Sequence, residues 1–130
     1  MDPLFEKIKS NIGTAKMNVD IAHTVQREAI DSGLEDEAFR NVTNLINKFM
    51  TETSSAAEVI DQRLQNLRRY SNSFFFVAKK RYSNSYRNFR RELDATDQLA
   101  DIVLASSQLA LEQMHKAVAN AEEWRIRQGP

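Results

Sequence analysis

The hydrophobic positions at the start of the chain follow a helical period. Apolar or small residues recur there in steps of three and four: Phe5, Ile8, Ile12, Ala15, Val19, Ala22, Gln26 and Ala29. This spacing places the row on one face of a helix. Asp2 followed by Pro3 is typical of a helix start, and Gly33 suits the left-handed residue after a helix end. We therefore predict a helix that starts at Pro3 and ends just before Gly33.

A second row of the same period predicts a second helix. Its members are Phe39, Val42, Ile46, Phe49, Thr53, Ala56, Ile60 and then Leu64 or Leu67. The acidic run 35–37 precedes this row and suits the positive end of a helix dipole. The polar stretch 51–55 is a weak point, but the period continues across it. We predict one helix of about 50 Å at 1.5 Å per residue, followed by a turn at residues 71–73.

The third segment carries a seven-residue repeat. One row contains Phe75, Tyr82, Phe89, Thr96, Val103, Ala110, Ala117 and Trp124, and its companion contains Tyr86, Leu93, Ala100, Ser107, Met114 and Ala121. A repeat of seven kept over this length implies left-handed supercoiling against neighbouring helices. Trp124 is expected to plug the end of the bundle. Asp94 could cap a new helix, so this segment is either one long helix or two helices divided near Asp94.

Together these patterns predict an all-α fold. We expect an antiparallel bundle of three long helices, or of four if the chain breaks near Asp94, with heptad-like seams and with residues 1–130 in one domain. Many seam positions hold alanine, serine or threonine, which bury little apolar area at about 25 cal/mol per Å². A thin core in long helices indicates that a partner supplies further burial, and we predict self-association.

Charge is distributed unevenly along a chain with no net charge. The 18 Lys and Arg residues balance the 18 Asp and Glu residues, yet the segment from Arg63 to Arg91 contains basic residues and no acidic ones. The same segment holds most of the aromatic residues. A chain this polarised is expected to present a positive surface, and such a surface attracts an anionic partner.

The candidate binding residues lie within this basic-aromatic segment. On a helix at 100° per residue, one face of residues 74–93 is aromatic and is expected to be core. The adjoining face collects Lys79, Lys80, Arg87, Arg90 and Arg91, and Arg68 and Arg69 lie at the end of the preceding helix. Tyr70, Phe74 and Phe76 remain as rings that could stack on bases or contact a partner.

An intramolecular explanation of the charge pattern stays open. Acidic residues gather at Glu28, Asp31, Glu35, Asp36 and Glu37, and again at Glu92, Asp94, Asp97 and Asp101. Either cluster could lie against the basic face, within the bundle or in a neighbouring subunit. The polarity would then direct assembly rather than ligand binding.

Catalytic and metal-binding patterns are scarce. The chain has no cysteine, and it has no glycine-rich phosphate loop or serine-nucleophile motif. Glu112 and His115 have the i,i+3 spacing of di-iron bundles. Asp20 and His23 have the same spacing in the first predicted helix, with aspartate in place of glutamate. Two inward glutamates from other helices would also be required, so surface histidines are the preferred interpretation. We expect no enzyme activity, no metal and no cofactor.

The sequence therefore favours a non-enzymatic, self-associating helical protein that binds an anionic partner. Nucleic acid is the first candidate, as in a coat, nucleocapsid or packaging protein. One alternative is a protein-interaction module, an adaptor, chaperone or assembly subunit, whose basic face meets an acidic protein. Another is a protein of the anionic membrane surface. The start of the chain has no signal-peptide pattern and no apolar run is long enough to span a bilayer, which favours the cytoplasm or a virion.

Overall fold

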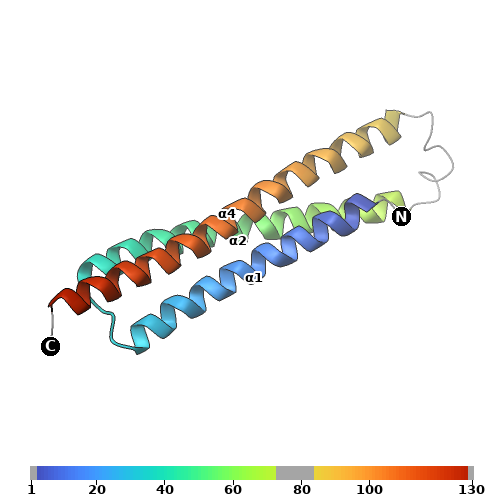
Figure 1. The fold of residues 1–130 in the computed structure, drawn as a ribbon. Helices are drawn as coiled ribbons and strands as arrows, with labels where there is room; N and C mark the ends of the chain where they lie inside the picture. The colour runs from blue at the N-terminus through green and yellow to red at the C-terminus, as the bar shows by residue number, and fades with distance from the viewer. Residues whose placement is uncertain (1–2, 73–83, 129–130) are drawn as a thin grey trace.

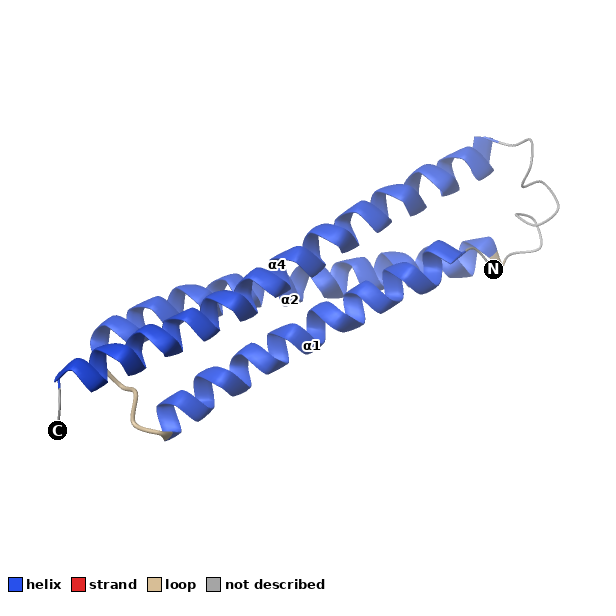
Figure 2. Ribbon diagram, in the orientation of Figure 1, coloured by secondary structure: helices blue, strands red, loops and turns tan. Residues whose placement is uncertain are grey.

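A computed structural model describes residues 3–72 and 84–128 and shows three helices packed against one another (Figure 1). They are α1 (Pro3–Asp31), α2 (Glu37–Ser71) and α4 (Asn84–Gln128). α2 runs opposite to α1 and α4, and all described regular structure is helical (Figure 2). The predicted all-α fold is confirmed. α2 ends and α4 begins at the end of the bundle where α1 starts, while the α1–α2 loop lies at the other end beside the last turns of α4.

The helix boundaries follow the expected local signals. α1 begins at Pro3, and Gly33 adopts a φ of 103° just after its end. Asp36 caps α2 by accepting a hydrogen bond from the backbone N–H of Phe39 at 3.1 Å. α2 is continuous through residues 51–55, as predicted.

α4 does not break near Asp94. Its carboxylate lies 3.6 Å from Nε of Arg90 one turn earlier, instead of capping a new helix. Thr96 sits within the same continuous helix, and its hydroxyl donates to the carbonyl of Glu92 at 2.7 Å. The local polar groups are therefore satisfied inside a single helix of 45 residues.

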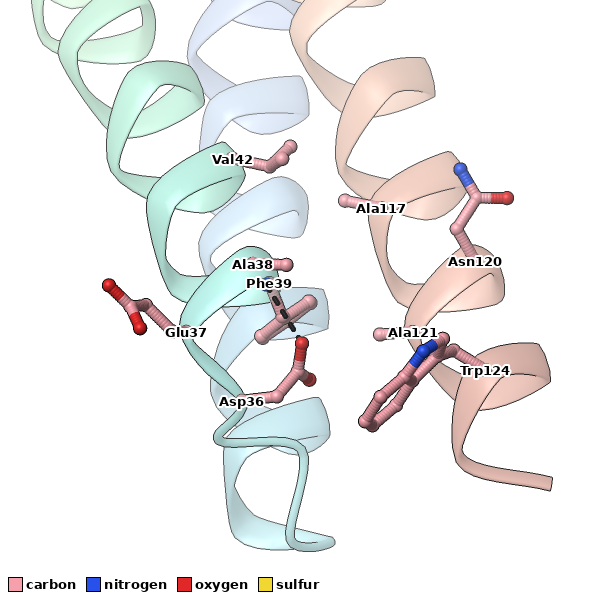
Figure 3. Close-up of a pocket in the computed structure, with 9 residues that line it drawn as sticks. All are labelled: Asp36, Glu37, Ala38, Phe39, Val42, Ala117, Asn120, Ala121 and Trp124. Carbon is pink, nitrogen blue, oxygen red and sulfur yellow. Dashed lines mark hydrogen bonds between the residues drawn. The ribbon is translucent and has the colours of Figure 1, made fainter. Parts of the chain in front are cut away.

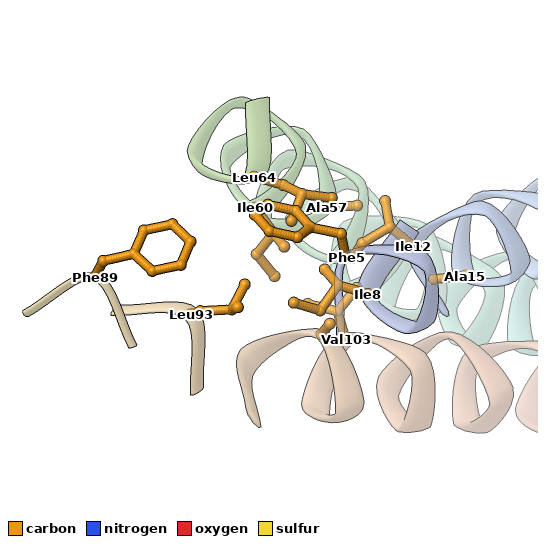
Figure 4. Packing of buried hydrophobic residues seen from close by; sticks show 11 residues of the cluster. Phe5, Ile8, Ile12, Ala15, Ala57, Ile60, Leu64, Phe89, Leu93 and Val103 are labelled. Atoms are coloured by element: carbon orange, nitrogen blue, oxygen red, sulfur yellow. The ribbon is translucent and has the colours of Figure 1, made fainter. Parts of the chain in front are cut away.

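The hydrophobic core is divided into three clusters along the bundle. The largest lies near the start of α1 and joins residues of all three helices, including Phe5, Ile8, Ile60, Leu64 and Leu93 (Figure 4). A middle cluster surrounds two buried methionines, and the last gathers Leu34 of the α1–α2 loop with small residues of α4. The core is thus built largely from small side chains in its middle and far portions.

Two of the three predicted seams agree with the buried residues. All predicted apolar positions of α1 are buried, and Gln26 is half-buried. In α4 the two rows are buried from Phe89 to Ala121. Positions 75 and 82 lie outside the described residues.

The α2 seam is confirmed at Phe39, Thr53, Ile60 and Leu64 and is wrong by one residue at three positions between them. Thr43, Met50 and Ala57 are buried, whereas the prediction placed Val42, Phe49 and Ala56 there. The sequence offers two adjacent rows, and period alone cannot choose between them. A threonine can occupy the buried row because its hydroxyl is satisfied by its own helix: Thr43 donates to the carbonyl of Phe39 at 3.0 Å.

Trp124 does not plug the bundle. Its side chain is 54% exposed, because it lies almost one turn beyond Ala121, the last buried residue of α4. The seven-residue row therefore continues in the sequence past the point where the other helices can cover it.

The hydroxyl groups of the four buried threonine and serine residues are satisfied. The hydroxyls of Thr53 and Ser107 donate to carbonyls of the preceding turn at 2.9 and 2.7 Å. Ser107 also accepts a hydrogen bond from Nδ2 of Asn18 at 3.1 Å, which joins α4 to α1. Buried hydroxyls that keep a partner avoid the cost of about 1–3 kcal/mol for an unsatisfied group.

Candidate interaction surfaces

The first surface is the basic end of the bundle, which we define as the end where α2 finishes and α4 begins. It carries Arg63, Arg68, Arg69, Arg87, Arg90 and Arg91. Arg68 serves packing within the chain. Its Nη2 lies 3.4 Å from Oε1 of Glu6, and its guanidinium lies 5.5 Å from the centre of the Phe5 ring. Arg68 thereby ties α2 to the start of α1.

Two further candidates on α2 also have local contacts. Arg69 donates to the side-chain oxygen of Asn66 at 3.2 Å. The ring of Tyr70 stacks on Phe89 of α4, with centroids 6.1 Å apart and an interplanar angle of 27°. Tyr70 is 39% exposed, so part of the ring remains accessible.

On α4, the basic residues differ in their surroundings. Arg90 is half-buried and faces Asp94, whereas Arg87 and Arg91 are exposed. A shallow hollow on the outer side of α4 is lined by Tyr86, Arg87, Arg90, Arg91, Asp94, Ala95 and Gln98. The other predicted site residues, Lys79, Lys80, Phe74 and Phe76, lie outside the described residues.

The first acidic cluster does not meet the basic face within one chain. Residues 28–37 lie at the opposite end, where Nη1 of Arg125 donates to the carbonyl of Ser32 at 3.0 Å. We call this the acidic end. It includes Glu28, Asp31, Glu35, Asp36 and Glu37. Intramolecular neutralisation by this cluster is therefore wrong, because the length of the bundle separates the two groups.

The second acidic cluster mainly serves α1. Nζ of Lys7 lies 3.1 Å from Oδ1 of Asp97 and 3.9 Å from Oδ2 of Asp101. The hydrogen bond to Asp97 raises the pKa of Lys7 above its ordinary value of 10.5; partial desolvation opposes this shift, and the charges of both carboxylates reinforce it. Only Asp94 of this cluster is seen facing a described basic-end residue, Arg90.

The second surface is an exposed apolar face shared by α2 and α4, which sequence reasoning missed. Six large residues form this α2–α4 face: Val42, Leu45 and Val59 of α2, and Leu99, Ile102 and Leu109 of α4. Their exposures range from 39% for Leu99 to 71% for Leu45. Each directly precedes a residue that packs in the core. Because α2 and α4 are antiparallel, residues that directly precede a core position on either helix lie on the same side of the helix pair.

The other sides of α2 and α4 are polar and contact α1. Residues that follow core positions include Glu58, which lies 2.8 Å from Nζ of Lys16, and Asp97 and Asp101, which bind Lys7. Between α2 and α4, the described residues form no hydrogen bond or ion pair with each other. The outer α2–α4 face thus carries the six apolar residues, while polar contacts run through α1. The same face also includes four charged residues that directly precede buried ones: Glu52, Arg63, Glu92 and Lys116.

An apolar pocket lies at the acidic end of this same face (Figure 3). Val42 of the α2–α4 face lines it together with Asn120 of α4. The exposed indole of Trp124 forms one wall and lies toward Asp36 at the start of α2, whereas the carboxylate of Glu37 points away (Figure 3). The pocket can accept an apolar or cationic group beside the Asp36 carboxylate.

The residues considered for a metal site are not assembled into one. Asp20, His23, Glu112 and His115 are all exposed, and Oε1 of Glu112 lies 3.2 Å from Nζ of Lys116. Across residues 3–72 and 84–128, no three His, Asp or Glu side chains come together as a metal-binding group.

Over residues 3–72 and 84–128, the fold and these surfaces define an all-α bundle of three helices with a basic end, an acidic end and an exposed apolar side. No protein-family model matches the chain, and neither does any curated protein or solved structure. Long as they are, the described helices lack the apolar stretch that crossing a bilayer requires.

Proposed function

We propose that this protein works by association rather than catalysis, as a helical assembly protein that binds further copies of itself through the α2–α4 face. The observation that carries this proposal is the concentration of six exposed large apolar residues on one side of two adjacent helices. Contiguous apolar patches of this kind mark interaction sites in proteins. The heptad-like seams suit such assembly, because a further pair of helices can pack across them.

The expected driving force is the removal of this face from water. Val42 and Val59 are separated by about 26 Å along α2 at 1.5 Å per residue. With two helices about 10 Å apart, the face covers roughly 500 Å² on each copy. A symmetric pair would bury about 1,000 Å², close to the lower limit for a specific interface. We therefore expect reversible association that depends on protein concentration.

Light scattering coupled to size-exclusion chromatography tests the proposal. Ile102→Glu places a charge on the α2–α4 face and should shift the protein toward the monomer. Met17→Glu is the matched control, because Met17 is equally exposed at 60% but lies on α1. A wild-type protein that stays monomeric at high concentration would overturn the proposal, as would equal effects of the two substitutions in variants that remain helical.

Binding of an anionic partner is the second candidate function, with nucleic acid first. It is favoured by the exposure of Arg87 and Arg91 on the outer side of α4. Each phosphate contact should make binding fall with salt, by about 0.9 log unit per log unit of salt for a duplex and about 0.7 for a single strand. Arg91→Glu should weaken binding more than Arg27→Glu, which reverses an exposed cation of α1 near the opposite end of the bundle.

Fluorescence anisotropy with a labelled oligonucleotide at two salt concentrations measures this binding. No binding, or affinity independent of salt, would contradict the nucleic-acid candidate.

Two other results would identify the alternative partners. Sedimentation with anionic but not neutral vesicles would favour a membrane surface, and salt-sensitive binding of acidic polypeptides alone would favour an acidic protein partner.

A further inference from the structure

We infer that a second copy of this chain packs antiparallel across the α2–α4 face, so that the basic end of each copy lies over the acidic end of the other. The inference rests on the proposed self-association and adds its orientation. It starts from the geometry of a face made of two antiparallel helices, for which two symmetric pairings exist.

In one pairing, the two-fold axis runs along the bundle. α2 then packs on α4 of the other copy, and like ends of the two bundles meet. In the other pairing, the axis runs across the bundle within the interface. α2 then packs antiparallel on its own counterpart, α4 does the same, and opposite ends meet. The apolar face alone permits both.

The distribution of charge favours one of the two pairings over the other. Six arginines gather at the basic end and outnumber the carboxylates of Glu6, Asp61, Glu92 and Asp94 there. At the acidic end, the five carboxylates already named and those of Glu122 and Glu123 outnumber Arg27, Arg40, Arg125 and Arg127. Pairing with the axis along the bundle brings arginine to arginine and carboxylate to carboxylate, which is unfavourable. Pairing with the axis across the bundle places the opposite charges together and leaves neither end uncompensated.

Four of the six apolar residues are spaced for this second pairing. The midpoint between Leu45 and Val59 on α2 is residue 52, and the midpoint between Ile102 and Leu109 on α4 is at residues 105–106. These midpoints lie at one level of the bundle, because Ala57 shares a core cluster with Ala100 and Val103, and Met50 shares one with Ala110. A two-fold axis at that level brings Leu45 onto Val59 and Ile102 onto Leu109 of the other copy.

One detail fits this arrangement. At the acidic end, the exposed indole of Trp124 lies toward Asp36 (Figure 3). An arginine from the basic end of the other copy would meet both an aromatic face and a carboxylate there, a setting that suits a guanidinium.

Single-cysteine spin labelling tests the orientation, since the natural chain contains no cysteine to interfere. Asn41→Cys and Gln62→Cys place labels on exposed positions of α2 near the two ends of the face. About the axis at residue 52, identical labels at residue 41 are offset along the bundle by about 33 Å, and those at residue 62 by about 30 Å, at 1.5 Å per residue. A label at 41 and one at 62 on the other copy lie at nearly the same level.

Pulsed electron paramagnetic resonance should therefore give distances beyond 30 Å, roughly, for each variant alone. A mixture of the two variants should add a shorter distance that neither variant shows. Short distances in the separate samples, with only a longer distance of about 32 Å added on mixing, would establish the other pairing and overturn the inference. A broad distribution without a defined distance would also overturn it, because it indicates unspecific packing. Light scattering on the same samples separates these outcomes from a failure to associate at all, which would refute the proposed function itself.

Discussion

The ammonium group of Lys7 lies 3.1 Å from Oδ1 of Asp97, which links the beginning of α1 to α4. Asn11 and Asn18 add further links, to Asp101 and Ser107 of α4 at 3.1 Å each. α1 is thus the helix that carries the polar contacts of the bundle. Because α1 occupies the polar sides of both other helices, the apolar side shared by α2 and α4 is left exposed.

The first prediction concerns the pH dependence of the Lys7 contact. The pKa of Lys7 is raised in the folded protein, so its contribution to stability is fully present below the ordinary value of 10.5 and is lost as pH rises through the folded pKa. Lys7→Gln should lower Tm at pH 8, and the difference from wild type should vanish above the folded pKa. Thermal melts followed by circular dichroism measure this. A difference that persists unchanged into strong alkali would exclude the charge as its cause.

The second prediction uses two glycines in different settings. Gly13 lies in the middle of α1, and a Cβ added there would meet nothing within 4 Å. Gly13→Ala should therefore stabilise the protein by about 0.5–1 kcal/mol, through better helix propensity. Gly33→Ala should destabilise it by about 1–2 kcal/mol, because φ is 103° there and the new Cβ would lie 3.4 Å from Nη2 of Arg125. Denaturant unfolding measures both, and changes of the same sign would contradict this account.

The sequence predicted the helices and their buried seams more reliably than the exposed faces of the bundle. The seams of α1 and α4 could be predicted because each has one dominant apolar row. α2 has two adjacent rows, one with Thr43 and Met50 and one with Val42 and Phe49, and only contact with α1 and α4 decides which is buried. The same ambiguity concealed the α2–α4 face, since apolar residues beside a seam cannot be assigned to solvent from period alone.

The sequence showed that one segment is basic, but it did not show which residues lie next to these charges in the folded protein. A basic segment with no acidic residue was evident, but Arg68 has Glu6 and Phe5 as neighbours, which are distant in the chain. The position of the acidic cluster at the other end of the bundle follows from the antiparallel path of α2. That separation depends on topology, which local sequence patterns do not encode.

A third prediction compares two isoleucines with opposite surroundings. Ile8 is fully buried and Ile102 is 61% exposed. Ile8→Ala should cost about 2–5 kcal/mol of unfolding free energy, because it removes core contacts and leaves a cavity. Ile102→Ala should change the stability of the monomer by no more than about 0.5 kcal/mol, yet it should weaken self-association. Chemical denaturation of dilute protein and light scattering of concentrated protein separate the two effects. An Ile102→Ala variant that associates like wild type would count against the α2–α4 face.

The last prediction uses Trp124, the chain's single tryptophan, as a natural reporter. Its indole is 54% exposed at the edge of the α2–α4 pocket, so dilute protein should emit as a solvated indole that acrylamide quenches readily. As the concentration rises, the partner's basic end should cover the indole, and both quenching and emission wavelength should fall. Ile102→Glu should abolish the change, whereas Met17→Glu should preserve it. If emission stays constant while light scattering reports association, Trp124 lies outside the interface and the antiparallel arrangement loses its contact at the acidic end.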